Sequence, residues 1–178
     1  MIPEDEQYSK MRGFSRVDAH IPFEVRLVPK AERGTMKSRT LGDMPLVDTR
    51  VLPELQDKVL GEWIRMLNSK LDDIIIKLSS QKEGFGTLPI AHVNISGGGL
   101  GFFSKERYSL GDIVEAKVIL PMMPPVALFL YCEVVKVDET PKGYMIATKF
   151  AALDEEITDE VVKFVFKRQR EILREQRR

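Results

Sequence analysis

Apolar and polar residues alternate over six short segments that are separated by glycine- and proline-rich turns. In the first segment, Phe23 and Val25 alternate with Glu24 and Arg26. A period of two residues is typical of half-buried strands. The predicted strands are residues 22–28, 89–96, 99–104, 112–120, 126–137 and 143–151. Six short strands at this spacing predict a mainly β fold, a small six-stranded antiparallel barrel.

The period changes between the first and second strands. Residues 53–82 place apolar side chains at alternating spacings of four and three, which is a heptad seam. We expect one long helix that begins near Pro53 and ends before Gly84. The seam consists of Leu60, Ile64, Leu67, Leu71, Ile74 and Leu78. Its apolar face is widened by Val59, Trp63, Met66 and Ile75.

Two roles are open for this helix. It can pack on its own barrel, or it can associate with the same helix of other copies. The second role is favoured, because the seam is longer and more regular than a six-stranded barrel needs for cover. A dimer and a tetrameric bundle are both compatible with the broad apolar face.

The predicted layout has four parts. Residues 1–10 form a flexible arm, 11–34 and 86–153 form the barrel, and 35–85 form a helical insert. Residues 154–178 form a C-terminal helix, with Thr158 as its cap and a basic tail at its negative end.

Composition excludes some classes of partner. The net charge is +0 and the isoelectric point is about 6.8, so no global field attracts nucleic acid or anionic membrane. Cys132 is the single cysteine, so it cannot form an intramolecular disulfide, and we expect it to be buried in a strand. The acidic N-terminus is unlike a signal peptide, and no apolar run reaches the ~20 residues of a membrane span. A cytoplasmic protein without membrane insertion is expected.

The sequence contains no motif that indicates catalysis or metal binding. The two histidines, His20 and His92, lie far apart and lack the spacing of metal ligands. The sequence contains no nucleophile elbow and no recognisable triad. We therefore expect a non-catalytic protein with no metal and no cofactor.

The stretch NISGGGLGFFS, residues 94–104, follows a strand and leads into another strand. It matches neither a dinucleotide-binding nor a phosphate-loop fingerprint. Asn94 and Ser96 lie on the same side of the strand. Gly99 carries no Cβ, which permits close approach of a ligand. The turn is either a simple hairpin or a ligand seat.

A second candidate element precedes the first strand. Arg12 and Arg16 stand four residues apart in a glycine-containing segment. A guanidinium group can bind phosphate oxygens or the acceptor edge of guanine through two hydrogen bonds, and it also stacks on bases.

The order RxxxR, strand, then [D/N]xSxxG resembles the PilZ domain, the bacterial receptor for cyclic di-GMP. The segments RVDAHIPFEVRL, GGLGFFSKERYSLGDIVEAKVILP and VVKFVFKRQRE resemble the first strand, the third and fourth strands, and the helix after the barrel in that family. The resemblance implies that RxxxR wraps over the ligand phosphates and guanine faces, and that [D/N]xSxxG holds a guanine edge. The implied ligand residues are Arg12, Arg16, Asn94, Ser96 and Gly99.

Two features depart from the family pattern. Many members carry a basic residue directly before the first arginine, where a stacked ligand dimer is held. Here that position is Met11, with Lys10 before it, so one ligand and an intercalated pair both stay open. Further contacts are expected from Lys10, Met11, Gly97 and Gly98. The second departure is the long helical insert between the first and second strands.

The function implied is a cyclic di-GMP receptor that changes conformation and signals to an unidentified partner protein in motility, biofilm or exopolysaccharide control. One alternative is a nucleotide-independent adaptor that acts through helix-mediated contacts. A barrel that binds RNA or DNA is disfavoured, because the strand faces carry few basic residues.

Overall fold

A computed structural model describes residues 15–41, 56–123 and 125–177. The chain divides into two compact units, which are described separately. One comprises Met1–Thr40 and Leu88–Arg178, and the other comprises Leu41–Thr87. The second unit starts after the predicted residue 35, because Arg39 and Thr40 still pair with the barrel. The predicted flexible arm, residues 1–10, lies outside the described residues.

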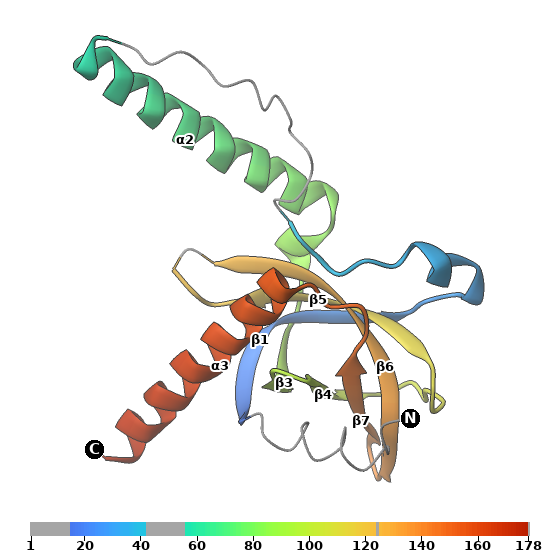
Figure 1. The fold of residues 1–178 in the computed structure, drawn as a ribbon. Coiled ribbons are helices and arrows are strands. Elements are labelled where there is room, and N and C mark those ends of the chain that lie inside the picture. Colours follow the sequence, from blue (N-terminus) through green and yellow to red (C-terminus); the bar gives the residue numbers. More distant parts are fainter. Residues whose placement is uncertain (1–14, 42–55, 124, 178) are drawn as a thin grey trace, which may run out of the picture. The chain divides into compact units, whose positions relative to one another are not determined.

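The first unit is built on a closed antiparallel β-barrel (Figure 1). The strands follow the order β6-β5-β1-β3-β4-β7, and β7 pairs again with β6, which closes the sheet. They are β1 (Arg16–Leu27), β3 (Ile90–Ser96), β4 (Gly99–Ser104), β5 (Ile113–Leu120), β6 (Val126–Thr140) and β7 (Gly143–Phe150). A short strand, β2 (Arg39–Thr40), adds to β6. The predicted six-stranded barrel is confirmed.

Strand β1 begins at Arg16, earlier than the hydrophobic pattern predicted, because it is shared between two partners. Its first half pairs with β3 as far as Pro22, and its second half pairs with β5 from Phe23 onward. Pro22 has no backbone N–H to donate, which suits a point where the ladder changes partner. The backbone N–H of Phe23 donates to the carbonyl of Pro89, 2.9 Å away.

Alternate residues of every strand fill the barrel. Ile21, Val93, Val114, Leu130 and similar side chains are fully buried, as the period-two pattern requires. Cys132 is buried among them, as predicted, and burial raises the pKa of its thiol to about 12.

Helix α3 (Glu155–Gln176) lies beside β1 and β3 and completes the core (Figure 1). Its buried residues are Ile157, Val161, Phe164 and Val165. The predicted cap at Thr158 is wrong. The helix starts at Glu155 after Asp154, and the hydroxyl of Thr158 instead donates to the carbonyl of Asp154 at 2.9 Å, one helical turn back.

The second unit contains α2 (Lys58–Lys82), followed by the short helix η2 (Phe85–Thr87). The inserted helix is confirmed, but it does not begin at Pro53. Asp57 is the N-cap of α2, because its Oδ1 accepts hydrogen bonds from the N–H groups of Val59 and Leu60 at 3.0 and 3.2 Å. Among the described residues, no helix is long and apolar enough to cross a membrane.

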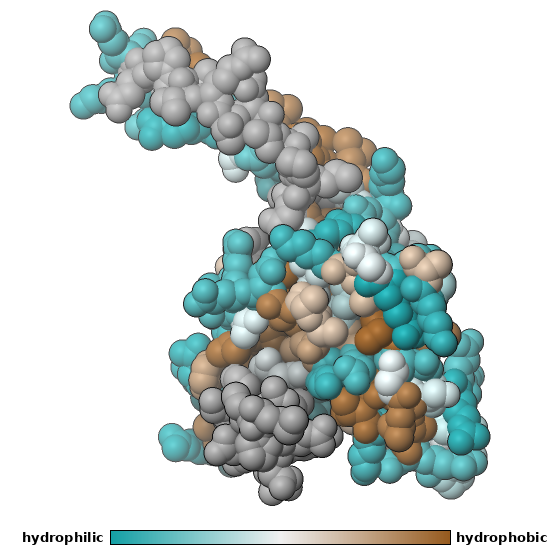
Figure 2. All heavy atoms as spheres, turned by 45° about the vertical axis from the view of Figure 1, so that its right-hand side comes forward, coloured by the Kyte–Doolittle hydropathy of each residue, from teal (hydrophilic) through white to brown (hydrophobic). Residues whose placement is uncertain are grey.

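The apolar face of α2 is exposed in the single chain (Figure 2). The exposed fractions of the six seam side chains run from 37% at Ile64 to 61% at Leu78. Trp63 and Val59, which widen the seam, are 60% and 64% exposed. Monomeric proteins rarely leave a contiguous apolar surface of this kind in water.

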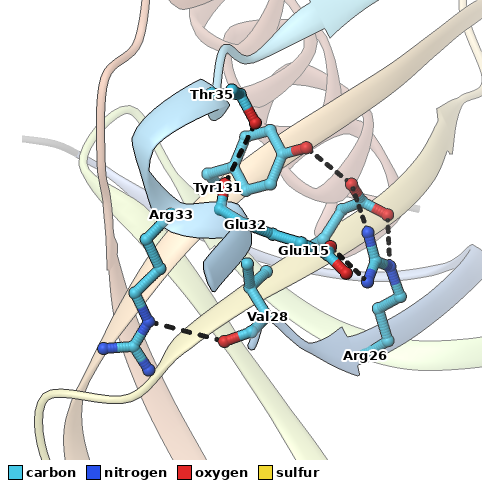
Figure 3. A network of polar contacts seen from close by, with 7 residues as sticks. All are labelled: Arg26, Val28, Glu32, Arg33, Thr35, Glu115 and Tyr131. Atoms are coloured by element: carbon cyan, nitrogen blue, oxygen red, sulfur yellow. Dashed lines mark hydrogen bonds and ion pairs between the residues drawn. The ribbon is translucent and has the colours of Figure 1, made fainter. Parts of the chain in front are cut away.

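A polar network covers the outer side of β1, β5 and β6 (Figure 3). Glu115 on β5 accepts two hydrogen bonds from Arg26, at 2.9 and 3.3 Å, and one from the Tyr131 hydroxyl at 2.7 Å. Arg26 also contacts Glu32 of the short helix η1 (Lys30–Thr35) at 3.2 Å. Burial by itself raises the pKa of Glu115, but the hydrogen bonds from Arg26 and Tyr131 outweigh it, so the pKa is lowered.

Replacing Glu115 by Gln is expected to lower the free energy of unfolding by about 1–3 kcal/mol at pH 7, because the charge-assisted bonds are lost. The lowered pKa means that the carboxylate stabilises the fold above the unfolded-state pKa of about 4.3. The difference between parent and variant should therefore shrink as the pH falls through the folded-state pKa. Urea unfolding at pH 7 and at pH 3 measures both values.

Glu133→Gln is the matched control. Glu133 pairs with Lys149 at 3.2 Å on the surface, and exposed pairs contribute about 0–1 kcal/mol. Equal losses in the two variants, or a Glu115→Gln loss that does not change with pH, would contradict the role assigned to the network.

Candidate functional site

Three residue pairs form a polar column across the outer face of β1 and β3. The strand register places Arg16 opposite Ser96, Asp18 opposite Asn94, and His20 opposite His92. The register therefore brings one arginine of the RxxxR motif next to the glycine-rich hairpin. The two histidine rings stack edge to face with their centroids 5.1 Å apart.

Ser96 organises the turn between β3 and β4. Its hydroxyl oxygen accepts from the N–H of Gly98 at 3.2 Å, and the hydroxyl donates to the carbonyl of Gly99 at 3.4 Å. The carbonyl of Gly98 accepts from the N–H of Phe150, 2.9 Å away on β7. Ser96 is only 7% exposed, so its hydroxyl mainly holds the shape of the turn.

Gly99 is required by the packing of the barrel. A Cβ at this position would overlap the carbonyl oxygen of Thr148 and lie 3.0 Å from its carbonyl carbon. From the sequence alone, we expect this glycine to permit the close approach of a ligand. The structure supplies a different reason, the close passage of β7, and ligand contact at Gly99 stays a prediction.

Replacing Gly99 by Ala is expected to destabilise the barrel by about 1–3 kcal/mol, the usual cost of overpacking, because the backbone of β7 must move. Gly101→Ala is the control on the same strand. A Cβ there meets Asn94 at 3.5 Å, which is ordinary contact. Thermal or urea unfolding compares the stability of the two variants. If Gly99→Ala is as stable as Gly101→Ala, the backbone of β7 can move without cost and the packing role assigned to Gly99 is wrong.

A pocket of about 190 Å³ opens beside the turn. It is lined by residues of β1, β3, β4, β6, β7 and the β3–β4 turn, namely Arg16, Asn94, Ser96, Gly98, Gly99, Leu100, Gly101, Val135, Ala147 and Thr148. The hydroxyl of Thr148 donates to the carbonyl of Leu100 at 2.9 Å, so this buried polar group is satisfied. The more exposed polar side chains that line the pocket are Arg16, which is exposed, and Asn94, which is half-buried.

Asn94 is held by a neighbour that the sequence analysis did not identify. Its Nδ2 donates to Oδ1 of Asp18 at 3.0 Å, and His92 Nε2 lies 3.4 Å from the same oxygen. The backbone carbonyl of Asp18 accepts from Arg168 of α3 at 3.4 Å. Asp18 shares its strand face with Arg16, and period-two alternation in the first strand was the signal that could have indicated it.

The structure brings together Arg16, Asn94, Ser96, Gly98 and Gly99, and Gly97 lies in the same turn. Lys10, Met11 and Arg12 lie outside the described residues, so their predicted contacts stay predictions. In the described part of the chain, no group of three or more His, Cys, Asp or Glu residues could hold a metal ion.

The comparisons agree on the family. The PilZ domain model matches residues 74–167, more than half of the chain, and this range contains Asn94, Ser96 and Gly99. Among solved structures, the chain is similar to a Xanthomonas campestris protein described as a new tetrameric PilZ domain self-assembled via an unusual helical bundle. The TM-score is 0.59 at 16% identity, over 90% of this chain and 91% of that one. No curated protein matched. With its closed barrel, terminal helix and inserted helix, this chain belongs to the PilZ domain family.

Proposed function

We propose that this chain is a cyclic di-GMP receptor whose ligand rests on the pocket beside the β3–β4 turn. The observation that carries the proposal is the meeting of the two motifs in space. Arg16 comes from the N-terminal motif and Asn94, Ser96 and Gly99 come from the hairpin, and all four line one pocket.

The chemistry of the pocket mouth suits a guanine nucleotide. At about 190 Å³ the pocket is smaller than the ~300–1,000 Å³ that encloses a whole small ligand, so it suits one base and leaves the rest outside. Arg16 can bind a phosphate or the O6/N7 edge of guanine in bidentate geometry. The amide of Asn94 can reach the remaining polar edge of the base.

In this proposal the segment that carries Arg12, which lies outside the described residues, closes over the nucleotide. Its closure changes the surface that is shown to a partner protein. The shift between the open and closed states is limited by the difference in ligand affinity between them.

Calorimetric titration with cyclic di-GMP tests the proposal, with the linear dinucleotide pGpG and GMP as controls. The cyclic ligand holds two guanines and two phosphates in one pre-organised shape. We expect it to bind at least ~10-fold more tightly than pGpG, a difference of about 1.4 kcal/mol. Absence of binding would overturn the receptor function and favour the nucleotide-independent adaptor.

We also propose that α2 assembles copies of this chain into an oligomer. All six seam side chains are exposed in the single chain, although a heptad seam is the surface that helices bury against one another. The similar Xanthomonas campestris protein is described as a tetramer that assembles through a helical bundle. A bundle would bury Trp63 and Met66 as well as the seam, because they broaden the same apolar face.

A further inference from the structure

We infer that Asp18 determines base specificity by fixing the orientation of the Asn94 amide. The inference rests on the proposed function, because it concerns the base that the pocket selects. Nδ2 of Asn94 and Oδ1 of Asp18 are 3.0 Å apart, across a directly paired position of β1 and β3. Asp18 thereby becomes a positioning residue that acts through Asn94.

The orientation follows from hydrogen-bonding capacity. An ionised carboxylate only accepts, whereas a side-chain amide donates from nitrogen and accepts at oxygen. The nitrogen of Asn94 must therefore face Asp18, because the flipped amide would set two acceptors against each other. This assignment leaves Oδ1 of Asn94 as the atom that is available to a ligand in the pocket.

An outward carbonyl oxygen favours guanine over adenine. The Watson–Crick edge of guanine carries two neighbouring donors, N1–H and the N2 amino group, and proteins read unpaired bases by such edges. Adenine presents an acceptor, N1, at the corresponding place. The Asn94 oxygen would then face another acceptor, and the two unpaired acceptors would weaken the binding of adenine.

The carboxylate of Asp18 is itself held in place. His92 Nε2 lies 3.4 Å from the oxygen that accepts from Asn94, and His20 stacks against His92. The side chains of Asp18 and His92 are 65% and 52% exposed, so this pair contributes little to stability. Removing Asp18 should therefore change ligand selection and leave the fold intact.

The test is calorimetry with cyclic di-GMP and with cyclic di-AMP on the parent, on Asp18→Ala and on Glu24→Ala. Glu24 is an exposed acidic residue on the same strand that does not line the pocket. Asp18→Ala is expected to weaken cyclic di-GMP binding roughly 3–10-fold, the value of one hydrogen-bonded orientation. It should also lower the preference for guanine over adenine, while Glu24→Ala changes neither and the melting temperatures of all three agree.

Repeating Asp18→Ala in an Asn94→Asp variant separates an effect on the orientation of the Asn94 amide from a general effect of the Asp18 charge. Asn94→Asp presents acceptor oxygens whichever way it turns, so it needs no neighbour to orient it. Asp18→Ala should then leave cyclic di-GMP binding unchanged or strengthen it in the Asn94→Asp background, because two facing carboxylates repel. An equal loss in both backgrounds would overturn the inference.

The outcomes also separate the two proposals. If the parent binds cyclic di-GMP and Asp18→Ala keeps both its affinity and its base preference, only the inference on Asp18 fails. If the parent binds no cyclic di-GMP, the receptor function fails, and the inference fails with it.

Discussion

Replacing Leu67 and Leu71 by glutamate is expected to convert the proposed oligomer into monomers. The two residues are adjacent members of the α2 seam and are 54% and 55% exposed in the single chain. Glutamate at both positions would bury unpaired carboxylates at every helix contact, which costs several kcal/mol per ion. Sedimentation velocity should show the parent as an oligomer and the double variant as a single monomeric species.

The matched control is Ser69→Glu with Ser80→Glu. It adds the same charge, but at 100° per residue both serines lie on the side of α2 opposite the seam. This control should sediment like the parent. Because the seam is exposed in the single chain, the Leu67 and Leu71 variant should keep its barrel, which circular dichroism checks. If that variant and the parent sediment alike, α2 does not assemble the protein.

Arg12→Ala and Arg16→Ala are each expected to weaken cyclic di-GMP binding by about 1.5–3 kcal/mol, or roughly 10–150-fold in Kd. The loss is that of charge-assisted hydrogen bonds to phosphate or guanine. Arg16 lines the pocket directly, and Arg12 belongs to the same motif four residues earlier. Calorimetry with cyclic di-GMP measures the change.

Two further variants sharpen this result. Arg16→Lys keeps the charge but loses the planar fork, so it should recover only part of the affinity. Arg33→Ala removes an arginine that bonds the carbonyl of Val28 and does not line the pocket, and it should bind like the parent. Unchanged affinity in both Arg12→Ala and Arg16→Ala would refute the nucleotide site.

The barrel and the inserted helix could be predicted from the sequence because both follow simple periods. Alternation predicted which strand residues are buried, and the heptad spacing predicted the apolar face of α2. Helix ends were less accurate. Asp57 caps α2 at a point downstream of Pro53, and α3 begins at Glu155, before the predicted cap Thr158.

The candidate site could be predicted only in part, because its partners depend on register. Asn94 and Ser96 stood out through the glycine run, but no local pattern shows that Asp18 pairs with Asn94. The pairing follows from how β1 is shared between β3 and β5. The packing role of Gly99 was missed for a similar reason, because β7 approaches it from a distant part of the chain.

The burial of Glu115 beside Arg26 could not be predicted from the sequence either. Glu115 occupies an outward position on β5, where a charged residue is normally solvated. It is buried because it lies within a network that reaches Glu32 of η1 through Arg26 (Figure 3). The burial of Glu115 depends on the path of the chain after β1, so the alternation of apolar and polar residues along β5 does not predict it.

The central claim is that a guanine of cyclic di-GMP sits on the ledge formed by Asn94, Ser96 and Gly99. A crystal structure of the protein grown with cyclic di-GMP tests it most directly. We expect guanine N1–H or N2 within hydrogen-bond distance of Asn94 Oδ1, and Arg12 and Arg16 against the phosphates or the bases. Nucleotide density elsewhere on the protein, with the ledge empty, would contradict the account.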